Sequence, residues 1–377
     1  MRILQVTARY YPELQFGGPP QKIHDLSRGL VQRGHQVQIV TLHSGQHSAW
    51  REAHEGIDVC YLSWIGAGTW QVPLGLSTLT EEVRRADVIH CYGLYNLLCP
   101  AAACLADRRG RPVVLEPLGM YVPRTGHQRA KRLYHGLITS RMVERAAKVI
   151  ATSPTESEEL ADLVETERLV LRRNGIDLEL FRHLPRGGAF RADHGIEEGE
   201  RIILYLGRIS PIKNLEQLVQ AFGQADLDRA RLVLGGPMLE AGYARRLGAL
   251  ISDLDLANRV SLVGPLYGKA KLSALAAADL FVLPSLFESY GLAAAEAVAA
   301  GVPVLLTETC GLAMQIHERA GLAVPVGVSE LSRGLQILLE DVEQRARLTC
   351  RRDELLVELS WEGPLSQTEE LYACLVR

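Results

Sequence analysis

The sequence lacks several features that would place the chain in a membrane, in a disulfide-rich class or among common nucleotide-binding enzymes. No apolar run approaches the ~18–20 residues that a membrane-spanning helix needs. The seven cysteines are scattered and odd in number, and none forms a C-x-x-C pair, which argues against a zinc ribbon or a disulfide framework. There is no Walker lysine motif, no G-x-S-x-G element and no G-x-G-x-x-G dinucleotide fingerprint. A reduced cytoplasmic protein is the simplest interpretation, and a dehydrogenase is disfavoured.

Composition and length fit a soluble protein of two ordinary domains. The chain has 377 residues, of which 47% are apolar and 23% are charged. A net charge of −3 argues against a protein that binds nucleic acid through general electrostatics. The first residues, Met1–Val6, have the pattern of a strand rather than that of a secretion signal.

Short β-branched runs alternate with longer helix-like stretches, which is typical of parallel α/β sheets. The series restarts midway, and each series opens with a strand that leads into a glycine-containing loop, at Ile3–Gly18 and at Ile202–Lys213. The expected strands are Ile3–Thr7, Gln36–Leu42, Val59–Leu62, Val88–His90, Val113–Glu116, Val149–Thr152 and Leu169–Arg172, followed by Ile202–Leu206, Arg231–Gly235, Val260–Val263, Leu280–Pro284, Val304–Leu306 and Leu322–Pro325. We therefore expect two Rossmann-like domains in tandem.

The expected boundary lies in Asp177–Gly199, which is rich in Pro, Gly and charge. We expect an N-terminal domain over 1–180 and a C-terminal domain over 181–361. In such sheets a ligand sits beyond the carboxyl ends of the strands, so two facing domains would enclose a cleft. The tail Trp361–Tyr372 has the spacing of an apolar helix face.

Basic residues gather in Arg108–Lys148, which holds ten of them against two acidic ones, Glu116 and Glu144. A solvated helix face is the ordinary explanation of such a run. The functional alternative is attraction to an anionic membrane surface or to a phosphorylated acceptor, at about 1 kcal/mol per basic residue near such a surface.

The stretch Pro284–Glu296 contains the strongest chemical pattern in the sequence. A buried strand ends at Pro284, and a helix of small residues starts near Gly291. The free N–H groups and partial positive charge of a helix start are suited to a diphosphate, and glycine allows close approach. Glu288 and Glu296 would flank this seat, and carboxylates accept hydrogen bonds from sugar and ribose hydroxyls. Alone, the two glutamates could equally be a loop charge and a helix-surface charge.

A second loop strengthens this interpretation. Gly207–Asn214 follows a strong strand and precedes a helix, and it carries Arg208 and Lys213 at the carboxyl edge of the same expected sheet. Arginine can fork onto phosphate oxygens, and lysine can act as a point charge. Fixed cations at this position would stabilise the charge that develops on a departing nucleoside diphosphate.

These motifs together resemble the family 4 glycosyltransferases, which are retaining enzymes of the GT-B fold, and the resemblance runs over almost the full length. The matching segments are Gly17-Gly18, Asn174-Gly175-Ile176-Asp177 with Phe181, Gly207-Arg208 with Lys213-Asn214, Glu288-x7-Glu296, Ala300-Gly301-Val302-Pro303-Val304 and Gly321-Leu322-Ala323-Val324-Pro325. The resemblance implies an α/β GT-B architecture with a C-terminal helix, about 362–377, that crosses back onto the N-terminal domain.

The same resemblance implies roles for individual residues. Arg208 and Lys213 would bind the donor diphosphate, Glu288 would meet the transferred sugar, and Glu296 would hold the ribose. The remaining donor-binding candidates are Gly17, Gly18, Leu266, Tyr290, Gly291 and Leu292. Family members react by front-face attack in the usual proposal, in which the leaving phosphate takes the acceptor proton, so no dedicated base, metal or cofactor is expected.

The chain departs from the family pattern at two positions. Leu118 stands where relatives commonly carry a histidine that contacts the sugar, and Met314 stands where they often place a glutamate. His127 is a weak candidate to substitute for the missing histidine, and His90 has the pattern of a histidine packed at a strand end. These departures leave open which sugar is transferred.

Two D-x-D triples, Asp226–Asp228 and Asp253–Asp255, have the form of the metal-binding element of the other large glycosyltransferase fold. Each closes a helical segment shortly before an expected strand, so helix-end charges explain them better than metal ligands.

The sequence therefore predicts a hexosyltransferase that moves a sugar from a nucleotide-diphospho-sugar to a saccharide or lipid-linked acceptor in cell-surface polysaccharide or glycolipid assembly. We expect it in the cytoplasm, with peripheral membrane contact through Arg108–Lys148 as an option. The alternatives are a nucleotide-sugar 2-epimerase of the same fold and a catalytically silent sugar-nucleotide binder.

Overall fold

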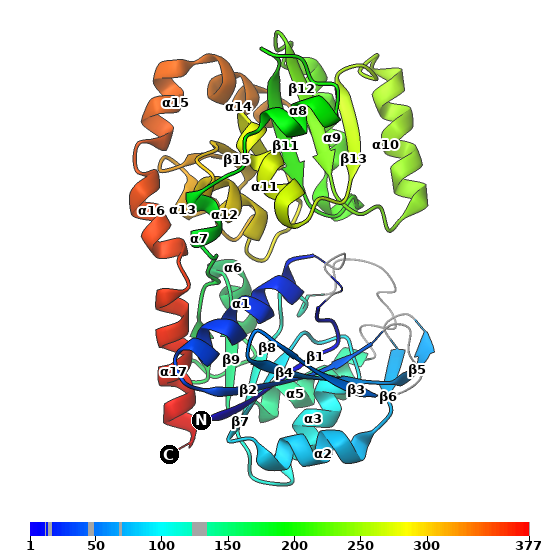
Figure 1. Ribbon diagram of the computed structural model, residues 1–377, viewed down its shortest axis with the longest axis vertical. Helices are drawn as coiled ribbons and strands as arrows, with labels where there is room; N and C mark the ends of the chain where they lie inside the picture. The colour runs from blue at the N-terminus through cyan, green and yellow to red at the C-terminus, as the bar shows by residue number, and fades with distance from the viewer. Residues whose placement is uncertain (12, 14–16, 44–48, 68–69, 123–133, 377) are drawn as a thin grey trace. The chain divides into compact units, whose positions relative to one another are not determined.

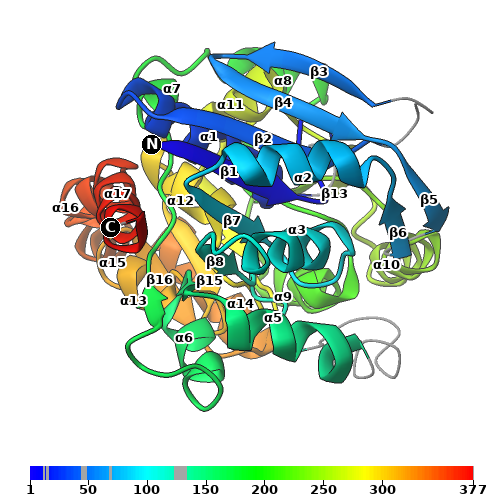
Figure 2. The same cartoon turned by 90° about the horizontal axis from the view of Figure 1, so that it is seen from below.

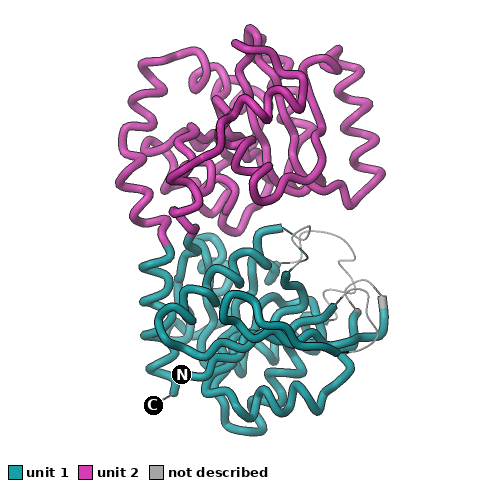
Figure 3. Tube along the Cα trace, in the orientation of Figure 1, with its two compact units in different colours: residues 1–175, 361–377 teal, residues 176–360 magenta. Residues whose placement is uncertain are grey.

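The chain separates into two compact units in a computed structural model that describes residues 1–11, 13, 17–43, 49–67, 70–122 and 134–376. Unit 1 comprises Met1–Gly175 with Trp361–Arg377, and unit 2 comprises Ile176–Ser360 (Figure 3). Among the described residues, no helix has both the length and the apolar character needed to span a membrane.

Unit 1 is built on an eight-stranded sheet in the order β10-β9-β8-β7-β1-β2-β4-β3. Figure 2 labels the strands of this sheet from β8 to β3. All neighbours are parallel except β3, which runs antiparallel to β4. The strands are β1 (Arg2–Thr7), β2 (Gln36–Leu42), β3 (Trp50–His54), β4 (Ile57–Leu62), β7 (Val88–Tyr92), β8 (Val113–Glu116), β9 (Lys148–Ala151) and β10 (Leu169–Leu171), and a separate two-stranded sheet holds β5 (Trp64–Ala67) and β6 (Trp70–Pro73).

Helices cover both faces of this sheet (Figure 1). They are α1 (Gly18–Gln32), α2 (Leu76–Arg85), α3 (Leu98–Asp107), the π-helical turn η2 (His135–Thr139), α5 (Ser140–Arg145), α6 (Pro154–Ala161) and α17 (Glu362–Val376). Successive residues of β1 point to opposite faces, so Ile3 joins the apolar cluster under α1 and α17, whereas Leu4 joins the cluster under α2 and α3. Two cores thus share one sheet.

The C-terminal helix α17 packs against α1 and β7 of unit 1, as the resemblance implied. Leu365, Leu371 and Tyr372 of this helix are buried. A Cβ atom on Gly29 of α1 would lie 2.5 Å from Leu365 Cδ1, so glycine at this position permits the close approach of the two helices. Residues that are last in the chain therefore complete the core of the first unit.

Unit 2 is a six-stranded parallel sheet in the order β13-β12-β11-β14-β15-β16. Its strands are β11 (Arg201–Leu206), β12 (Ala230–Gly235), β13 (Val260–Gly264), β14 (Leu280–Leu283), β15 (Val304–Thr307) and β16 (Gly321–Val324). Its helices are α7 (Glu179–Arg182), α8 (Gly188–Asp193), η3 (Pro211–Lys213), α9 (Leu215–Gln224), α10 (Ala241–Asp253), α11 (Gly268–Ala277), α12 (Leu292–Ala299), α13 (Ala313–Ile316), α14 (Val328–Glu340), α15 (Val342–Thr349) and α16 (Arg352–Leu359). Central strands such as β14 are buried along their whole length, because helices cover both faces of the sheet.

All thirteen expected strands are present, with ends that differ by at most two residues. Three strands were not expected: β3, β5 and β6. The segment 177–199, where a linker was expected, instead carries α7 and α8, and Phe190 and Ile196 are buried in the core of unit 2. A segment rich in Pro, Gly and charge can still anchor two apolar side chains.

Candidate functional site

The strand order of unit 2 identifies where a ligand should bind. Counted along the chain, the strands lie in the order 3-2-1-4-5-6, which is the doubly wound arrangement of nucleotide-binding domains. The order reverses between β11 and β14, and ligands of such sheets bind beyond the carboxyl ends of the strands at this reversal. The loops that follow β11 and β14 are Gly207–Asn214 and Pro284–Gly291, the two segments that carry the sequence motifs.

The loop after β11 presents Arg208 to solvent. The buried Tyr205 hydroxyl fixes the backbone of this loop by donating a hydrogen bond to the Arg208 carbonyl at 2.8 Å. The Gly207 N–H donates to the Gly235 carbonyl at the end of β12, and the Ile209 N–H donates to the Pro237 carbonyl just after it. The Arg208 side chain is exposed. This loop holds a cation in a defined place and leaves its guanidinium accessible to a ligand.

Lys213 and Glu288 meet at the reversal point. The Lys213 ammonium donates to Glu288 Oε2, and both side chains are largely buried. Asn214 adopts a left-handed conformation at the start of α9, and its amide donates to the Pro284 carbonyl at 3.1 Å. The Leu286 N–H also bonds the Ile212 carbonyl at 2.9 Å. These two hydrogen bonds join the loop that carries Lys213 to the loop that carries Glu288, and so they fix both partners of the ion pair.

A third loop, which sequence reasoning did not single out, supports Glu288 from β15. The Glu288 N–H donates to the Thr309 carbonyl at 3.3 Å, and the Gly311 N–H donates to the Glu288 carbonyl at 2.9 Å. The hydroxyls of Thr307 and Thr309 both donate to the Ser285 carbonyl at 2.6 Å. Two threonines just beyond a predicted strand were the available signal for this support.

Helix α12 begins at the reversal point without a side-chain cap. Gly291 is its N-cap at φ +103°, and its carbonyl accepts from the N–H groups of Ala294 and Ala295. The earlier N–H groups of Gly291, Leu292 and Ala293 are left for a ligand, since a helix start lacks internal acceptors for them. Tyr290 is buried beside this start. The predicted helix is confirmed, and its N-terminus is suited to an anion.

Glu296 lies in the second turn of α12 and has a partner that the sequence did not reveal. The Lys271 ammonium of α11 donates to Glu296 Oε1 at 2.6 Å, and the Glu296 side chain is only 15% exposed. The only hint in the sequence was the pair of lysines, Lys269 and Lys271, after the β13 loop. In that loop, Leu266 lies against the end of β12, since a Cβ on Gly235 would be 3.2 Å from Leu266 Cδ1.

Other sequence-predicted residues lie elsewhere. Gly17 and Gly18 belong to unit 1, where Gly17 has φ +100° and precedes α1. The aspartates of both triples are exposed at helix ends, as predicted: one pair follows α9, and the other closes α10. Met314 is exposed on α13. His127 lies outside the described residues, as do four of the ten basic residues of Arg108–Lys148.

Leu118 follows β8 in a left-handed conformation with φ +61°, and Gly119 continues it at φ +68°. An L-residue pays roughly 1–2 kcal/mol for this conformation, and histidine tolerates it better than leucine does. The Gly119 N–H bonds Glu156, a buried carboxylate that also accepts from Thr152. The turn is therefore fixed by its surroundings, and leucine occupies it against its own backbone preference.

His90 is packed in the core, as predicted, but it is the central residue of β7 rather than a strand-end residue, and its setting was not suggested by the sequence. It belongs to a buried charge cluster formed by Lys22, Glu116 and Arg172 with His90. The Lys22 ammonium contacts Glu116 Oε1, and Arg172 Nη2 donates to Glu116 Oε2 at 2.8 Å. His90 Nε2 lies 3.7 Å from the same carboxylate. All four side chains are 0–2% exposed.

The cluster also binds the C-terminal helix. Tyr372 places its hydroxyl 2.6 Å from His90 Nδ1, and Arg172 Nη1 donates to the Thr368 hydroxyl at 3.1 Å. Burial lowers the pKa of His90 well below its ordinary value, and Arg172 and Lys22 add to this effect. The imidazole is thus neutral at pH 7. The arrangement anchors α17 through groups that are fully removed from water.

Comparisons with known proteins agree with this geometry. The family model described as "Glycosyl transferases group 1" matches residues 188–352, and that described as "Glycosyl transferase 4-like domain" matches residues 17–175. The first range lies within unit 2 and the second lies within unit 1. The fold and the two matches define the class of protein as a glycosyltransferase of the GT-B fold.

Individual relatives give the family. A D-inositol 3-phosphate glycosyltransferase of Kineococcus radiotolerans is 30% identical over 94% of this chain and 90% of its own length. One of Mycobacteroides abscessus is 31% identical over 70% of this chain and 63% of its own length. Anabaena Alr3699/HepE, solved in complex with UDP and glucose, has a TM-score of 0.80 and 21% identity over 99% of this chain and all of its own. The chain belongs to the group 1, or family 4, glycosyltransferases.

Proposed function

We propose that the enzyme transfers a hexose-type sugar, with retention of configuration, from a nucleotide-diphospho-sugar held by unit 2 to a saccharide or lipid-linked acceptor. The observation that carries the proposal is the contact of Lys213 with Glu288 beside the uncapped start of α12. An anion seat, fixed cations and a carboxylate converge at the reversal point of the sheet, where a nucleotide is expected.

We propose that the donor diphosphate binds at the start of α12. The open N–H groups at Gly291–Ala293 and the partial positive charge of the helix start favour its oxygens. Arg208 and Lys213 add two cations on the neighbouring loop. We propose that these groups neutralise the leaving nucleoside diphosphate, a task that a metal ion performs in other transferases, so that the catalysed step itself needs no metal.

Two carboxylates would hold the hydroxyls of the donor. Glu288 contacts the Lys213 ammonium, so we propose that it accepts a hydrogen bond from the sugar rather than acting as an isolated base. Glu296 uses Oε1 for Lys271, and its second oxygen remains an acceptor for a ribose hydroxyl. Each carboxylate has a fixed cation, which holds it in place before the donor arrives.

In the proposed reaction, the acceptor hydroxyl attacks the anomeric carbon on the face from which the diphosphate departs. The bond from the anomeric carbon to the phosphate oxygen breaks, and the acceptor oxygen forms the new glycosidic bond. The acceptor proton passes to the leaving phosphate oxygen, so the products are the glycoside and the nucleoside diphosphate. Attack on this face leaves the configuration unchanged.

The acceptor class is proposed from the named relatives and from basic residues of unit 1. Two of the relatives named above are D-inositol 3-phosphate glycosyltransferases, and D-inositol 3-phosphate is a phosphorylated polyol. In this chain, the described basic residues of Arg108–Lys148 include the exposed Arg108, Arg109 and Arg141. We propose that this surface attracts an anionic acceptor, or the anionic cytoplasmic membrane face on which a lipid-linked acceptor resides. Work in cell-surface polysaccharide or glycolipid assembly follows from that acceptor class.

Ligand-induced stabilisation tests the donor site directly. The full chain would be heated with UDP, GDP, ADP or TDP and then with their sugars. A nucleotide that binds only the folded protein at 100 times its Kd stabilises by ~2.7 kcal/mol. We expect one base to raise Tm well above the others. Lys213→Ala and Arg208→Ala should reduce this shift, because each removes a phosphate contact.

A matched control is Lys269→Ala, which removes an exposed lysine near the same site and should leave the shift intact. For transfer to acceptor, Glu288→Ala should cost on the order of 10²–10³ in kcat, which is typical for loss of one charge-stabilising group. Wild-type transfer in Lys213→Ala and Glu288→Ala would contradict the proposal. An epimerised donor formed without acceptor would favour the epimerase instead.

A further inference from the structure

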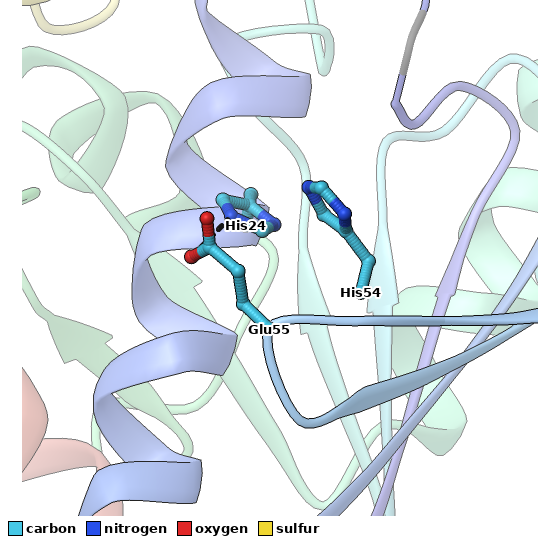
Figure 4. Close-up of side chains that lie close together, drawn as sticks. All are labelled: His24, His54 and Glu55. Carbon is cyan, nitrogen blue, oxygen red and sulfur yellow. Dashed lines mark hydrogen bonds and ion pairs between the residues drawn. The ribbon is translucent and has the colours of Figure 1, made fainter.

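Three metal-ligating side chains converge in unit 1, outside every residue considered so far. His24 lies in the middle of α1, His54 is the last residue of β3, and Glu55 follows it (Figure 4). One ligand atom of each lies within 4.8 Å of the other two. Figure 4 shows His54 and Glu55 reaching from the hairpin toward the helix, so the group joins segments about 30 residues apart in sequence.

The hairpin that carries two of these residues has little freedom. His54 pairs with Ile57, so Glu55 and Gly56 form a two-residue turn, and their φ values of +49° and +80° are those of a type I′ turn. A Cβ on Gly56 would lie 3.1 Å from Val31 of α1, so the turn rests directly on the helix. Glutamate is uncommon at a left-handed turn position, where Asn, Asp or Gly is preferred.

The surroundings of His24 suit a metal ligand. The Tyr10 hydroxyl lies 2.7 Å from Nδ1, which leaves Nε2 to face Glu55. Metal-bound histidines usually engage their other ring nitrogen in this way. The Tyr11 ring lies 4.6 Å from the His24 ring and 5.4 Å from the His54 ring, centroid to centroid.

We propose that His24, His54 and Glu55 bind a divalent transition metal, with zinc as the best fit. His24 Nε2 and Glu55 Oε2 are 3.4 Å apart, close to the about 3.3 Å between two ligands that each lie ~2.0–2.1 Å from a tetrahedral zinc. Two imidazoles and one carboxylate suit zinc, whereas magnesium and calcium prefer oxygen ligands. Three protein ligands leave a fourth position for water or another small ligand.

One neighbouring cation must adjust when the metal binds. Arg28 Nη1 lies 3.8 Å from Glu55 Oε2, beyond hydrogen-bond distance, and Arg28 Nη2 is also 3.9 Å from Asp25. A metal on Glu55 Oε2 would replace this 3.8 Å contact, and Arg28 would keep Asp25 as a second carboxylate neighbour. The site fastens the β3–β4 turn to α1, the helix that begins at Gly18.

Metal binding to the full-length, chelator-treated protein tests the proposal. Zinc would be titrated against a chromophoric chelator, and Tm would be measured with and without zinc and with magnesium. We expect one saturable zinc site, a Tm increase with zinc and none with magnesium. His54→Ala and Glu55→Gln should each weaken zinc binding at least ten-fold and abolish the Tm increase. Both side chains reach solvent, so the variants should fold.

The matched control is the His317–Glu318 pair of unit 2, whose side chains approach to 3.9 Å without a third ligand. His317→Ala and Glu318→Gln should leave zinc affinity unchanged. The exposed thiols of Cys350 and Cys374 are the competing zinc ligands, so Cys350→Ser/Cys374→Ser is a second control. Zinc binding that survives His54→Ala and Glu55→Gln, disappears with the two cysteines, or never saturates would overturn the proposal.

Discussion

The two units bury different kinds of side chain. Unit 2, whose residues 176–360 are all described, buries no Asp, Glu, Lys, Arg or His below 9% exposure, and its charged groups stand at or near its surface. The described part of unit 1 buries many: Glu13, Lys22, His24, Asp25, Glu82, His90, Glu116, Glu156 and Arg172. The charged side chains of unit 2 thus keep some contact with solvent, whereas unit 1 uses buried charges to hold distant segments together.

Because of this contrast, we expect changes in the charge of buried side chains to lower the unfolding free energy of unit 1 more than that of unit 2. The stability of unit 1 can be measured separately. All four tryptophans, at 50, 64, 70 and 361, belong to unit 1. Intrinsic tryptophan fluorescence during urea unfolding therefore follows unit 1, and far-UV circular dichroism follows the whole chain. Comparison of the two signals assigns each effect to a unit.

The largest effect is expected from Glu116→Gln. The substitution leaves Lys22 and Arg172 buried without their shared carboxylate, and loss of one partner of a buried ion pair costs roughly 3–5 kcal/mol. The tryptophan transition should move to much lower urea. Glu179→Gln is the control, because its partner Arg182 makes an exposed surface pair worth about 0–1 kcal/mol. Equal, small losses in both variants would contradict the role of the cluster.

A smaller loss of unfolding free energy is expected at acidic pH. His90 is buried and neutral, and its folded pKa lies well below the unfolded value of about 6.5. The unfolded chain therefore binds a proton that the folded chain refuses, so stability is present above pH 6.5 and falls as the pH drops below it. Between pH 7 and pH 5 this amounts to about 2 kcal/mol for His90. Urea unfolding at each pH, followed by fluorescence, measures it.

NMR spectroscopy can follow the protonation of the His90 imidazole directly. An NMR titration in which His90 protonates at pH 6 or above would remove it as the cause of acid sensitivity. His317→Gln in unit 2 should leave the acid dependence unaltered, since this side chain is partly exposed.

Gly291→Ala probes unit 2 at the helix start. Alanine at φ +103° is strained by about 1–2 kcal/mol, and its Cβ would stand beside the open N–H groups. We expect a loss of about this size in unfolding free energy and a weaker Tm response to the nucleoside diphosphate. Gly248→Ala on α10 is the control, because its space is open and its φ is helical, so it should stabilise slightly. Unchanged nucleotide response in Gly291→Ala would argue against the helix start as the phosphate seat.

The smallest expected change in stability comes from Leu118→His. Histidine is more tolerant of φ +61°, which offsets part of the apolar packing that leucine provides, so the net change should stay below about 1 kcal/mol. If this turn retains its family role at the sugar, the imidazole should lower the KM for the donor several-fold while kcat changes little. Steady-state kinetics with the preferred donor would decide, and an unaltered KM would assign the turn a structural role only.

The fold could be predicted well from sequence where strands are buried on both faces. Runs such as Leu280–Leu283 are continuous and apolar, so they stand out from the helices around them. Strand β3 was missed because Trp50–His54 lies at a sheet edge with mostly exposed side chains and has no apolar alternation. Strands β5 and β6 form a separate hairpin and were also missed.

The chemistry was predictable only where it follows the chain locally. Lys213 and Glu288 could be assigned to one sheet edge, because each comes just after a strand, but their mutual contact depends on loop geometry. Their roles in transfer stay predictions. The pairing of Lys22, Glu116 and Arg172 had no sequence signal, since the three residues are far apart and none belongs to a motif. Lys271 was also missed, since the lysine pair after the β13 loop does not by itself indicate a partner for Glu296.

The position of α17 has a consequence for how the chain is made. Thr368 and Tyr372 complete a cluster whose other members are encoded between residues 22 and 172, and the whole of unit 2 is synthesised in between. On the ribosome, unit 2 can finish folding while the groove for α17 still lacks its helix. Most of unit 1 is synthesised before unit 2, but its fold is completed only when α17 has been made. Until then, the charge cluster of unit 1 lacks its contacts with Thr368 and Tyr372. If translation stopped after unit 2, unit 2 would be folded, but unit 1 would lack α17 and stay incompletely folded. Chaperones and proteases recognise chains of this kind.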